Sequence, residues 1–214
     1  MGTSIQKIHK KINKLNSLYS NMKKPILATN IDDFLIDHSA FFEPHKEWFD
    51  RAIKKTKDKT LSKWKGREDY FLGVNEAMKK LMPDASPEQR TIQARMWFQE
   101  DVIRYIKEHP EAVKLSVVNK LKKLKLKYKL ALITTNSQNY INDILEAAIL
   151  DDLYDIILGS HTHEEPNKSE LIDRFLKEYG PPKYYISGKT YDKINSLLKE
   201  KGVKIIGLKD LEKI

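Results

Sequence analysis

The stretch that decides the fold reads ILATNIDDFLID over residues 26–37. Its first four residues are apolar or small, and this short run predicts a buried strand over 26–29. The strand ends at Asn30, and three acidic residues follow at Asp32, Asp33 and Asp37. Because ligands of parallel sheets bind beyond the carboxyl ends of the strands, this segment is the first candidate for a functional site.

Downstream of residue 113, helical and strand patterns alternate. Gly180 and Gly202 stand just past two of the expected helices, where a left-handed residue is favoured. The expected helices cover 114–127, 140–148, 169–179 and 191–201, and the expected strands cover 130–134, 154–158, 183–187 and 203–206. This alternation predicts an α/β domain with a doubly wound, Rossmann-like parallel sheet of about five strands.

Residues 39–112 have a different pattern, with helical periodicity over 41–55, 67–82 and 87–109 and no convincing strand. Ser86, Pro87 and Gln89 have the N-cap, first-turn and capping-box residue types that begin a helix. All three tryptophans fall in this region. They are expected to fill the core of a small helical bundle, although a place in a substrate pocket stays open.

The N-terminal residues 4–22 place apolar side chains at alternating three- and four-residue steps, which predicts an amphipathic helix. Such a short helix is marginally stable alone and must pack on something. Two interpretations remain open: it docks on its own domain, or it forms a homodimer contact.

The composition excludes several classes of function. The 214 residues include no cysteine, so disulfides and thiolate chemistry are excluded. No segment is long and apolar enough to span a membrane, and no signal-peptide core is present, so we expect a cytoplasmic protein without a membrane partner. The net charge of +9 comes mostly from lysine. It is read as a solvated surface, and no nucleic acid partner is expected, because no nucleic-acid-binding motif is present.

Polar residues also mark the other strand ends. Thr135 and Asn136 follow the second strand, and Lys168 opens the helix after the third. The fourth strand leads into Lys189 and Asp192. Since the carboxyl ends of parallel strands meet at one edge of a sheet, these side chains are expected to lie near Asn30 and Asp32.

These four segments, in this order, resemble the motifs of the haloacid dehalogenase (HAD) superfamily. The first motif of that family is usually written DxDxTLxD. This chain matches it at Asp32, Leu35 and Asp37 but has Asn30 at the nucleophile position and Phe34 where threonine is usual. The resemblance implies a core of residues 23–38 and 113–214, with an all-helical cap over 39–112 that covers the site.

The resemblance also implies roles for single residues. Asp32 corresponds to the general acid/base, Thr135 with Asn136 to the phosphate-binding pair, and Lys168 to the cation that stabilises the phosphate. In phosphatase members the fourth motif supplies acids that hold Mg²⁺. Here Lys189 replaces the first of these acids, so Asp192 is the remaining candidate metal ligand.

Both departures argue against ordinary turnover. The asparagine amide is uncharged and a poor nucleophile, and losing the nucleophile of such a unit removes nearly all catalysis. A lysine beside a metal site disfavours the metal, so no cofactor is expected, although Mg²⁺ would be needed if the site works. Lys189 is then expected to pair with Asp32 or Asp192, or to act with Lys168 as an anion-binding group.

Three functions remain open on the sequence alone. The first is a catalytically impaired phosphatase- or dehalogenase-type pseudo-enzyme that binds a small anionic molecule bearing phosphate or carboxylate. The second is an active HAD-type hydrolase, a phosphomonoesterase in which Asn30 is engineered or bypassed by Asp32 or Asp33. The third is a non-catalytic interaction protein that uses the N-terminal helix.

Overall fold

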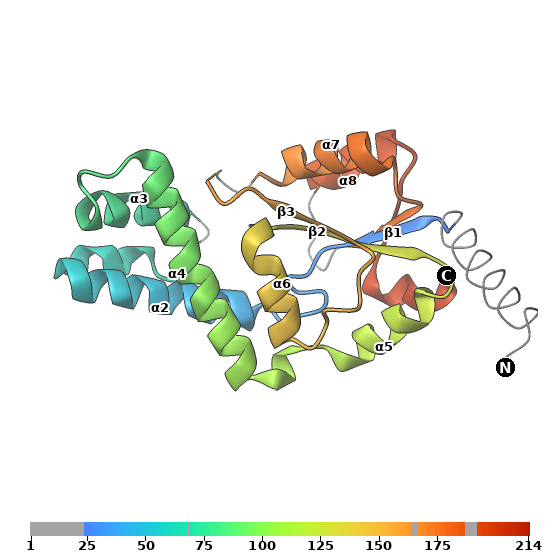
Figure 1. Cartoon of the computed structure of the whole chain (residues 1–214), viewed down its shortest axis with the longest axis horizontal. Coiled ribbons are helices and arrows are strands. Elements are labelled where there is room, and N and C mark those ends of the chain that lie inside the picture. The colour runs from blue at the N-terminus through green and yellow to red at the C-terminus, as the bar shows by residue number, and fades with distance from the viewer. Residues whose placement is uncertain (1–23, 68, 164–166, 187–191) are drawn as a thin grey trace, which may run out of the picture.

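The computed structural model describes residues 24–67, 69–163, 167–186 and 192–214. The expected helix over 4–22, and with it the homodimer contact, lies outside these described residues. Within them the chain forms a five-stranded sheet in the order β3-β2-β1-β4-β5, in which every neighbouring pair is parallel (Figure 1). The strands are β1 Ile26–Thr29, β2 Lys129–Ser137, β3 Ile156–Ser160, β4 Tyr184–Ile186 and β5 Lys204–Ile206. The predicted doubly wound α/β fold is confirmed.

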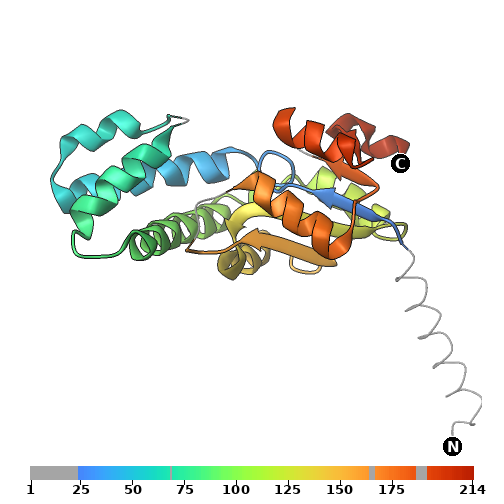
Figure 2. The ribbon, with the colours of Figure 1, turned by 90° about the horizontal axis from the view of Figure 1, so that it is seen from above.

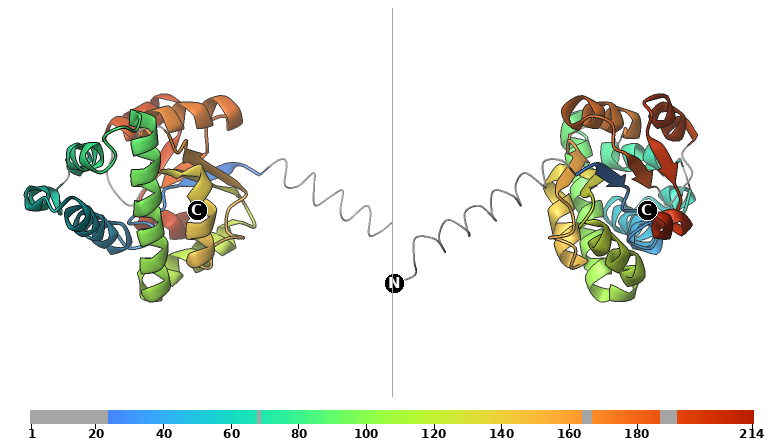
Figure 3. Two further views of the ribbon diagram at one scale, coloured as in Figure 1. Left: turned by 60° about the vertical axis from the view of Figure 1, so that its left-hand side comes forward. Right: turned by 90° about the vertical axis from the view of Figure 1, so that its right-hand side faces the viewer.

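Helices cover both faces of the sheet. Alternate residues of β2 explain why, because Leu130 and Leu132 pack into one apolar cluster while Ala131 and Ile133 pack into another. The first cluster includes residues of α5 (Leu115–Leu124) and α6 (Gln138–Ala147). The second includes residues of α7 (Lys168–Tyr179) and α8 (Asp192–Glu200), on the opposite side of the sheet (Figure 3). A strand buried on both faces reads as a continuous apolar run, as this one does.

Strand β2 is longer than the sequence predicts. It continues past the apolar run through Thr134 to Ser137, so Thr135 and Asn136 lie inside the strand and not after it. Its pairing with β3 shifts register between Ile133 and Ser137. The prediction from hydropathy ends the strand at residue 134, close to the end of the apolar run. In the structure, backbone pairing with β3 extends the strand to Ser137. Three short 3₁₀ helices, Lys59–Trp64, Pro110–Ala112 and Leu208–Lys213, also lack a counterpart in the sequence-based prediction.

The segment after β1 forms a helical layer beside the sheet, in which α2 (Ser39–Thr56), α3 (Tyr70–Leu81) and α4 (Pro87–Glu108) pack together (Figure 2). This layer is called the cap below. Trp48 is buried in its apolar cluster, and Trp64 and Trp97 pack against that cluster partly buried, as expected of core residues. Trp48 also lines a pocket, the place in the structure that the sequence left open for a tryptophan. At the start of α4 the predicted capping box is present: Ser86 Oγ accepts the Gln89 N–H at 3.2 Å, and the Ser86 N–H donates to Gln89 Oε1 at 2.8 Å.

The chain enters and leaves the cap through two segments that are bonded to each other. The Asp37 N–H donates to the Ala112 carbonyl at 2.8 Å, and the Lys114 N–H donates to the Leu35 carbonyl at 2.8 Å. An antiparallel bridge joins Ile36 and Val113 between them. The cap is therefore attached to the core by two adjacent antiparallel segments of the chain, around Ile36 and Val113.

A second attachment comes from the middle of α4. The Arg95 guanidinium donates to the carbonyl of Thr135 at 2.8 Å and to the carbonyl of His161 at 2.8 Å. It also donates to the Ser160 hydroxyl. One arginine of the cap thus holds the carboxyl ends of β2 and β3, and charged donors make such hydrogen bonds strong.

No helix in the described part of the chain combines the length and the apolar character that crossing a membrane requires.

Gly73 is a sensitive point of the cap. A Cβ atom at this position of α3 would lie 2.2 Å from Cγ and 2.7 Å from Cβ of Trp64, which are atoms near the backbone that move little. We expect Gly73→Ala to lower the free energy of unfolding by roughly 1–3 kcal/mol, despite the better helix propensity of alanine. Urea unfolding measures this change. The control Lys79→Ala, at an exposed position of the same helix, should stay within about 0.5 kcal/mol, and an equal loss in both variants would contradict the steric explanation.

Candidate active site

The first element of the site is the turn after β1. The Asn30 N–H donates to the Ile186 carbonyl of β4 at 3.1 Å, which extends the sheet by one residue and fixes the side chain at its edge. The side chain of Asn30 is 7% exposed, and its Nδ2 lies 3.5 Å from the Asp32 carbonyl oxygen. The Ile31 carbonyl accepts the N–H groups of Leu35 and Ile36 and so closes the turn.

Asp32 has a partner that the sequence did not suggest. Its Oδ1 lies 3.2 Å from Nδ1 of His38, the residue just before α2. The His38 ring also stacks on Phe42, with the ring centroids 5.7 Å apart. In the sequence, His38 is simply a histidine six residues after an aspartate. This spacing does not predict a contact, because the two side chains meet only when the turn at Ile31 reverses the chain.

Asp33 is turned away from the site. It adopts a positive φ of 59°, and Lys114 Nζ lies 3.3 Å from its carboxylate and 2.9 Å from its carbonyl oxygen. The side chain does not line the cavity described below. Of the two carboxylates considered as replacements for the nucleophile, only Asp32 is therefore within the site.

The second element is the end of β2. Thr134 Oγ1 accepts the backbone N–H of Asn136 at 3.2 Å and its side-chain amide at 3.0 Å, so the Asn136 amide is oriented by the strand itself. Thr135 accepts Arg95 through its carbonyl, as described above. Sequence reasoning identified Thr135 and Asn136 but missed Thr134, because an apolar run gives no indication that its next residue is a polar anchor.

Lys168 supplies the third element from the first turn of α7. Asn167 caps this helix, with Oδ1 accepting the Ser169 N–H at 3.1 Å. The Lys168 ammonium reaches across to β2 and donates to the Ile133 carbonyl. Burial of the amine lowers the pKa of Lys168 to about 7. The residue as a whole is partly exposed, because its side chain lines the cavity.

A cavity of about 730 Å³ brings these residues together. From the core it is lined by Asn30, Asp32, Thr134, Thr135, Asn136 and Lys168. Five of the seven residues proposed from sequence thus share one cavity. The opposite wall comes from the cap and was not anticipated; it includes His38, Phe41, Phe42, His45, Arg67, Tyr70, Phe71 and Phe98.

The two remaining candidates belong to the fourth motif. Lys189 lies outside the described residues, and Asp192 is described only as the first residue of α8. Their proposed roles, an anion-binding cation and a metal ligand, therefore stay predictions.

The described donor set does not fit Mg²⁺. This ion takes oxygen ligands in a near-octahedral arrangement and is usually held by one or two carboxylates. Among the described residues that line the cavity, Asp32 is the one carboxylate, and it faces His38; Asn30 offers a neutral amide. The described part of the chain holds no group of three or more metal-ligating side chains.

The family is decided by a sequence comparison that spans the site. The model of the haloacid dehalogenase-like hydrolases matches residues 30–186, which covers most of the core and the whole cap. The chain belongs to this family. The match begins at Asn30, the position where the motif places the nucleophile. The resemblance of the motifs, on which the sequence-based prediction relied, is thereby confirmed at the level of the family.

Solved structures of HAD-like proteins show the same fold. A haloacid dehalogenase-like hydrolase from Streptococcus pneumoniae is 16% identical with a TM-score of 0.52, and the alignment covers 86% of this chain and 84% of that one. CbbY from Rhodobacter sphaeroides, solved with phosphate, is 15% identical with a TM-score of 0.54, covering 86% and 85%. YfnB from Bacillus subtilis, bound to magnesium, is 12% identical with a TM-score of 0.51, covering 85% and 87%. No curated protein matches the sequence.

Proposed function

We propose that this HAD-family protein binds a small organic phosphate or carboxylate in the cavity between core and cap, and turns it over at no more than a background rate. The observation that carries the proposal is the neutral, buried Asn30 at the end of β1, in the same cavity as Lys168. The site keeps groups that bind an anion but lacks the charge that attacks it.

Binding follows from the polar groups at the core end of the cavity. Lys168 offers a cation when protonated, and Asn30, Thr134, Thr135 and Asn136 offer amide and hydroxyl donors. A carboxylate at position 30 would repel a phosphate dianion, so its replacement by an amide strengthens ground-state binding. The complex of CbbY with phosphate is consistent with an anion in a fold of this type.

The loss of turnover has an equally direct cause. Covalent phosphoryl transfer in this family begins with attack by a carboxylate oxygen, and the oxygen of an amide carries too little charge to replace it. Asp32 remains in place, with its Oδ1 3.2 Å from Nδ1 of His38, but an acid/base group without a nucleophile accelerates little.

The test pairs a binding measurement with an activity assay. Isothermal titration at pH 6 should show inorganic phosphate binding to the unchanged chain in a one-to-one complex. Hydrolysis of 4-nitrophenyl phosphate by the same sample, with and without Mg²⁺, should stay at the background rate. Turnover well above background would favour the alternative of an active phosphomonoesterase, and absence of phosphate binding would favour the interaction protein.

A further inference from the structure

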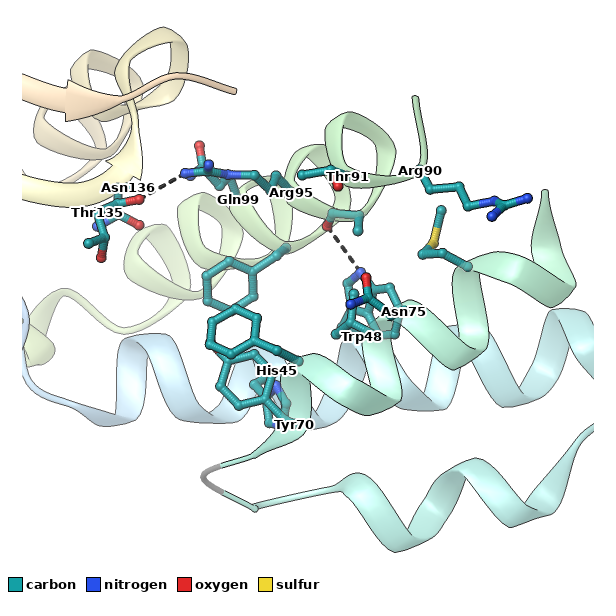
Figure 4. Close-up of a pocket in the computed structure, with 15 residues that line it drawn as sticks. His45, Trp48, Tyr70, Asn75, Arg90, Thr91, Arg95, Gln99, Thr135 and Asn136 are labelled. Atoms are coloured by element: carbon teal, nitrogen blue, oxygen red, sulfur yellow. Dashed lines mark hydrogen bonds between the residues drawn. The ribbon is translucent and has the colours of Figure 1, made fainter. Parts of the chain in front are cut away.

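The cavity has a second compartment inside the cap. It has a volume of about 150 Å³, and Figure 4 shows the residues that line it. It shares His45, Tyr70, Phe71, Phe98, Thr135 and Asn136 with the larger cavity, so the two adjoin. The larger cavity contains the anion-binding groups of the core. The smaller one lies among α2, α3 and α4. A ligand that fills both must therefore have an anionic end and a second group of another chemistry.

Aromatic side chains set the shape of the second compartment. Tyr70 and Phe71 stack with their centroids 4.1 Å apart, and Tyr70 lies 4.0 Å from the His45 ring. Trp48 and Phe98 also line the compartment. Aromatic faces of this kind favour a flat group that stacks against them. An apolar cavity of about 150 Å³ is known to hold benzene, so the volume matches one six-membered ring.

The arginines that border this compartment are already engaged. Arg90 donates to the carbonyls of Met82 and Pro83 at 2.9 and 2.6 Å. Arg95 donates to the carbonyl of Thr135 and to that of His161 (Figure 4 shows its bond to the β2 strand). The N–H groups that make these bonds are directed at backbone carbonyls and not into the compartment, so neither arginine is arranged to clasp a second anion. The occupant of the compartment is expected to be uncharged.

Two buried acceptors indicate what else the occupant carries. Neither Nε2 of His45 nor Oε1 of Gln99 has a hydrogen-bond partner among the residues that the structure describes. Both side chains line the compartment and are almost fully buried, at 5% and 2% exposure. Burial lowers the pKa of His45, although a hydrogen bond to the Trp64 backbone opposes the shift, so its imidazole is neutral near pH 7. The ring donates its N–H to Trp64, which leaves the unpartnered Nε2 as the acceptor. Buried polar atoms without partners are rare in folded proteins and costly, and a ligand N–H or O–H would satisfy them.

We infer that the ligand is a monophosphate or similar anion attached to a single six-membered ring that carries an N–H or O–H donor. The ring lies in the cap compartment against Tyr70 and Phe71, and its donor is accepted by His45 and Gln99. The anion lies at Lys168 in the core. This inference rests on the proposed function for the position of the anion, but the ring compartment can be tested separately.

The first measurement uses the unchanged chain, so it does not depend on the folding of a variant. Isothermal titration compares 4-aminophenyl phosphate, phenyl phosphate and glycerol 3-phosphate. We expect the ring to tighten binding at least tenfold over glycerol 3-phosphate, and the amino group to add a further factor of about five to ten. Equal dissociation constants for all three ligands would overturn the inference while leaving phosphate binding, and so the proposed function, intact.

The second measurement assigns the donor to its acceptors. His45→Phe and Gln99→Leu keep the size of each side chain but remove the acceptor. Each should cancel most of the advantage of 4-aminophenyl phosphate over phenyl phosphate. Gln99→Leu, at a position that does not line the larger cavity, should leave inorganic phosphate binding unchanged. Gln93→Leu makes the same chemical change on α4 at a position that does not line either compartment, and should change nothing. Loss of the advantage in the control as well would overturn the assignment.

A third probe distinguishes the inferred ring compartment from the proposed anion site. 4-Aminophenol carries the ring and the donors but no phosphate. If it binds and His45→Phe weakens it, while inorganic phosphate does not bind, the ring compartment is real and the proposed anion site is wrong. If 4-aminophenol and 4-aminophenyl phosphate both fail to bind, the inference is wrong.

Discussion

The double change Asn30→Asp with Lys189→Asp is expected to turn the chain into a measurable phosphomonoesterase. We expect kcat for 4-nitrophenyl phosphate in Mg²⁺ to rise on the order of 10³-fold or more, because a carboxylate nucleophile and a candidate metal ligand return together. Position 30 is suited to attack, since it lies at the edge of the sheet in the cavity that also contains Asp32 and Lys168. Steady-state assays at saturating substrate measure the change in kcat.

The single variants show which of the two substitutions causes the gain in kcat. Asn30→Asp alone should gain little if a lysine at 189 excludes the metal, and Lys189→Asp alone should gain nothing because no nucleophile is present. Adding Asp32→Asn to the double variant should remove the gain, since the acid/base group is then lost as well. If the unchanged chain already matches the double variant, the account of Asn30 given above is wrong.

Lys168 makes anion binding depend steeply on pH. Its pKa of about 7 in the free protein means that the amine is charged below pH 7 and neutral above it. Sulfate stays a dianion throughout this range and needs the charged form. Its affinity should therefore be constant below pH 7 and fall about tenfold for each pH unit above it, until the pKa of the complex is reached. Isothermal titration from pH 5.5 to 9 measures the slope.

The lowered pKa of Lys168 also makes the free energy of unfolding rise with pH. Between pH 7 and about 10.5 the unfolded chain binds a proton at Lys168 that the folded, ligand-free protein does not bind. The free energy of unfolding therefore rises with pH across this window, by at most about 1.4 kcal/mol per unit from this residue. Below pH 7 both states are protonated, and the destabilising effect of the buried charge is then fully present.

Lys168→Met is the matched control for both effects, because methionine has a similar shape and no charge. It should weaken sulfate binding on the order of a hundredfold at pH 6, and it should remove the added slope of stability against pH above 7. A variant that keeps the sulfate affinity and the pH profile of the unchanged chain would show that another group binds the anion.

Most of the fold could be predicted because local patterns and the global fold agree. The apolar runs around Leu27 and Leu132 are short and buried on both sides, and helices separate the later runs, which is sufficient to indicate a parallel sheet. The residues that the core contributes to the site could be predicted from the same alternation of strands and helices. Asn30, Thr135 and Lys168 each stand where a predicted strand ends or a helix begins, and such ends converge by topology alone.

The cap half of the site could not be predicted in the same way. His45 and Gln99 lie on helices whose sequence repeats show only which face is buried, and a buried face can meet another helix or a cavity with equal ease. His38 gains its importance only when the turn at Ile31 brings Asp32 back beside it. Contacts of this kind depend on how the helices pack against one another, and the local sequence pattern does not predict that packing.

The paired segments that join cap and core have an evolutionary meaning. Since Leu35 and Lys114 are hydrogen-bonded neighbours, the chain between them can change in length without moving a strand of the sheet, provided that the contacts of Arg95 with β2 and β3 are kept or replaced. A protein built in this way can acquire a new recognition module by a single insertion in its gene and keep its old chemistry. Conversely, a substitution at a single position of the core site leaves the module that faces the ligand from the other side intact.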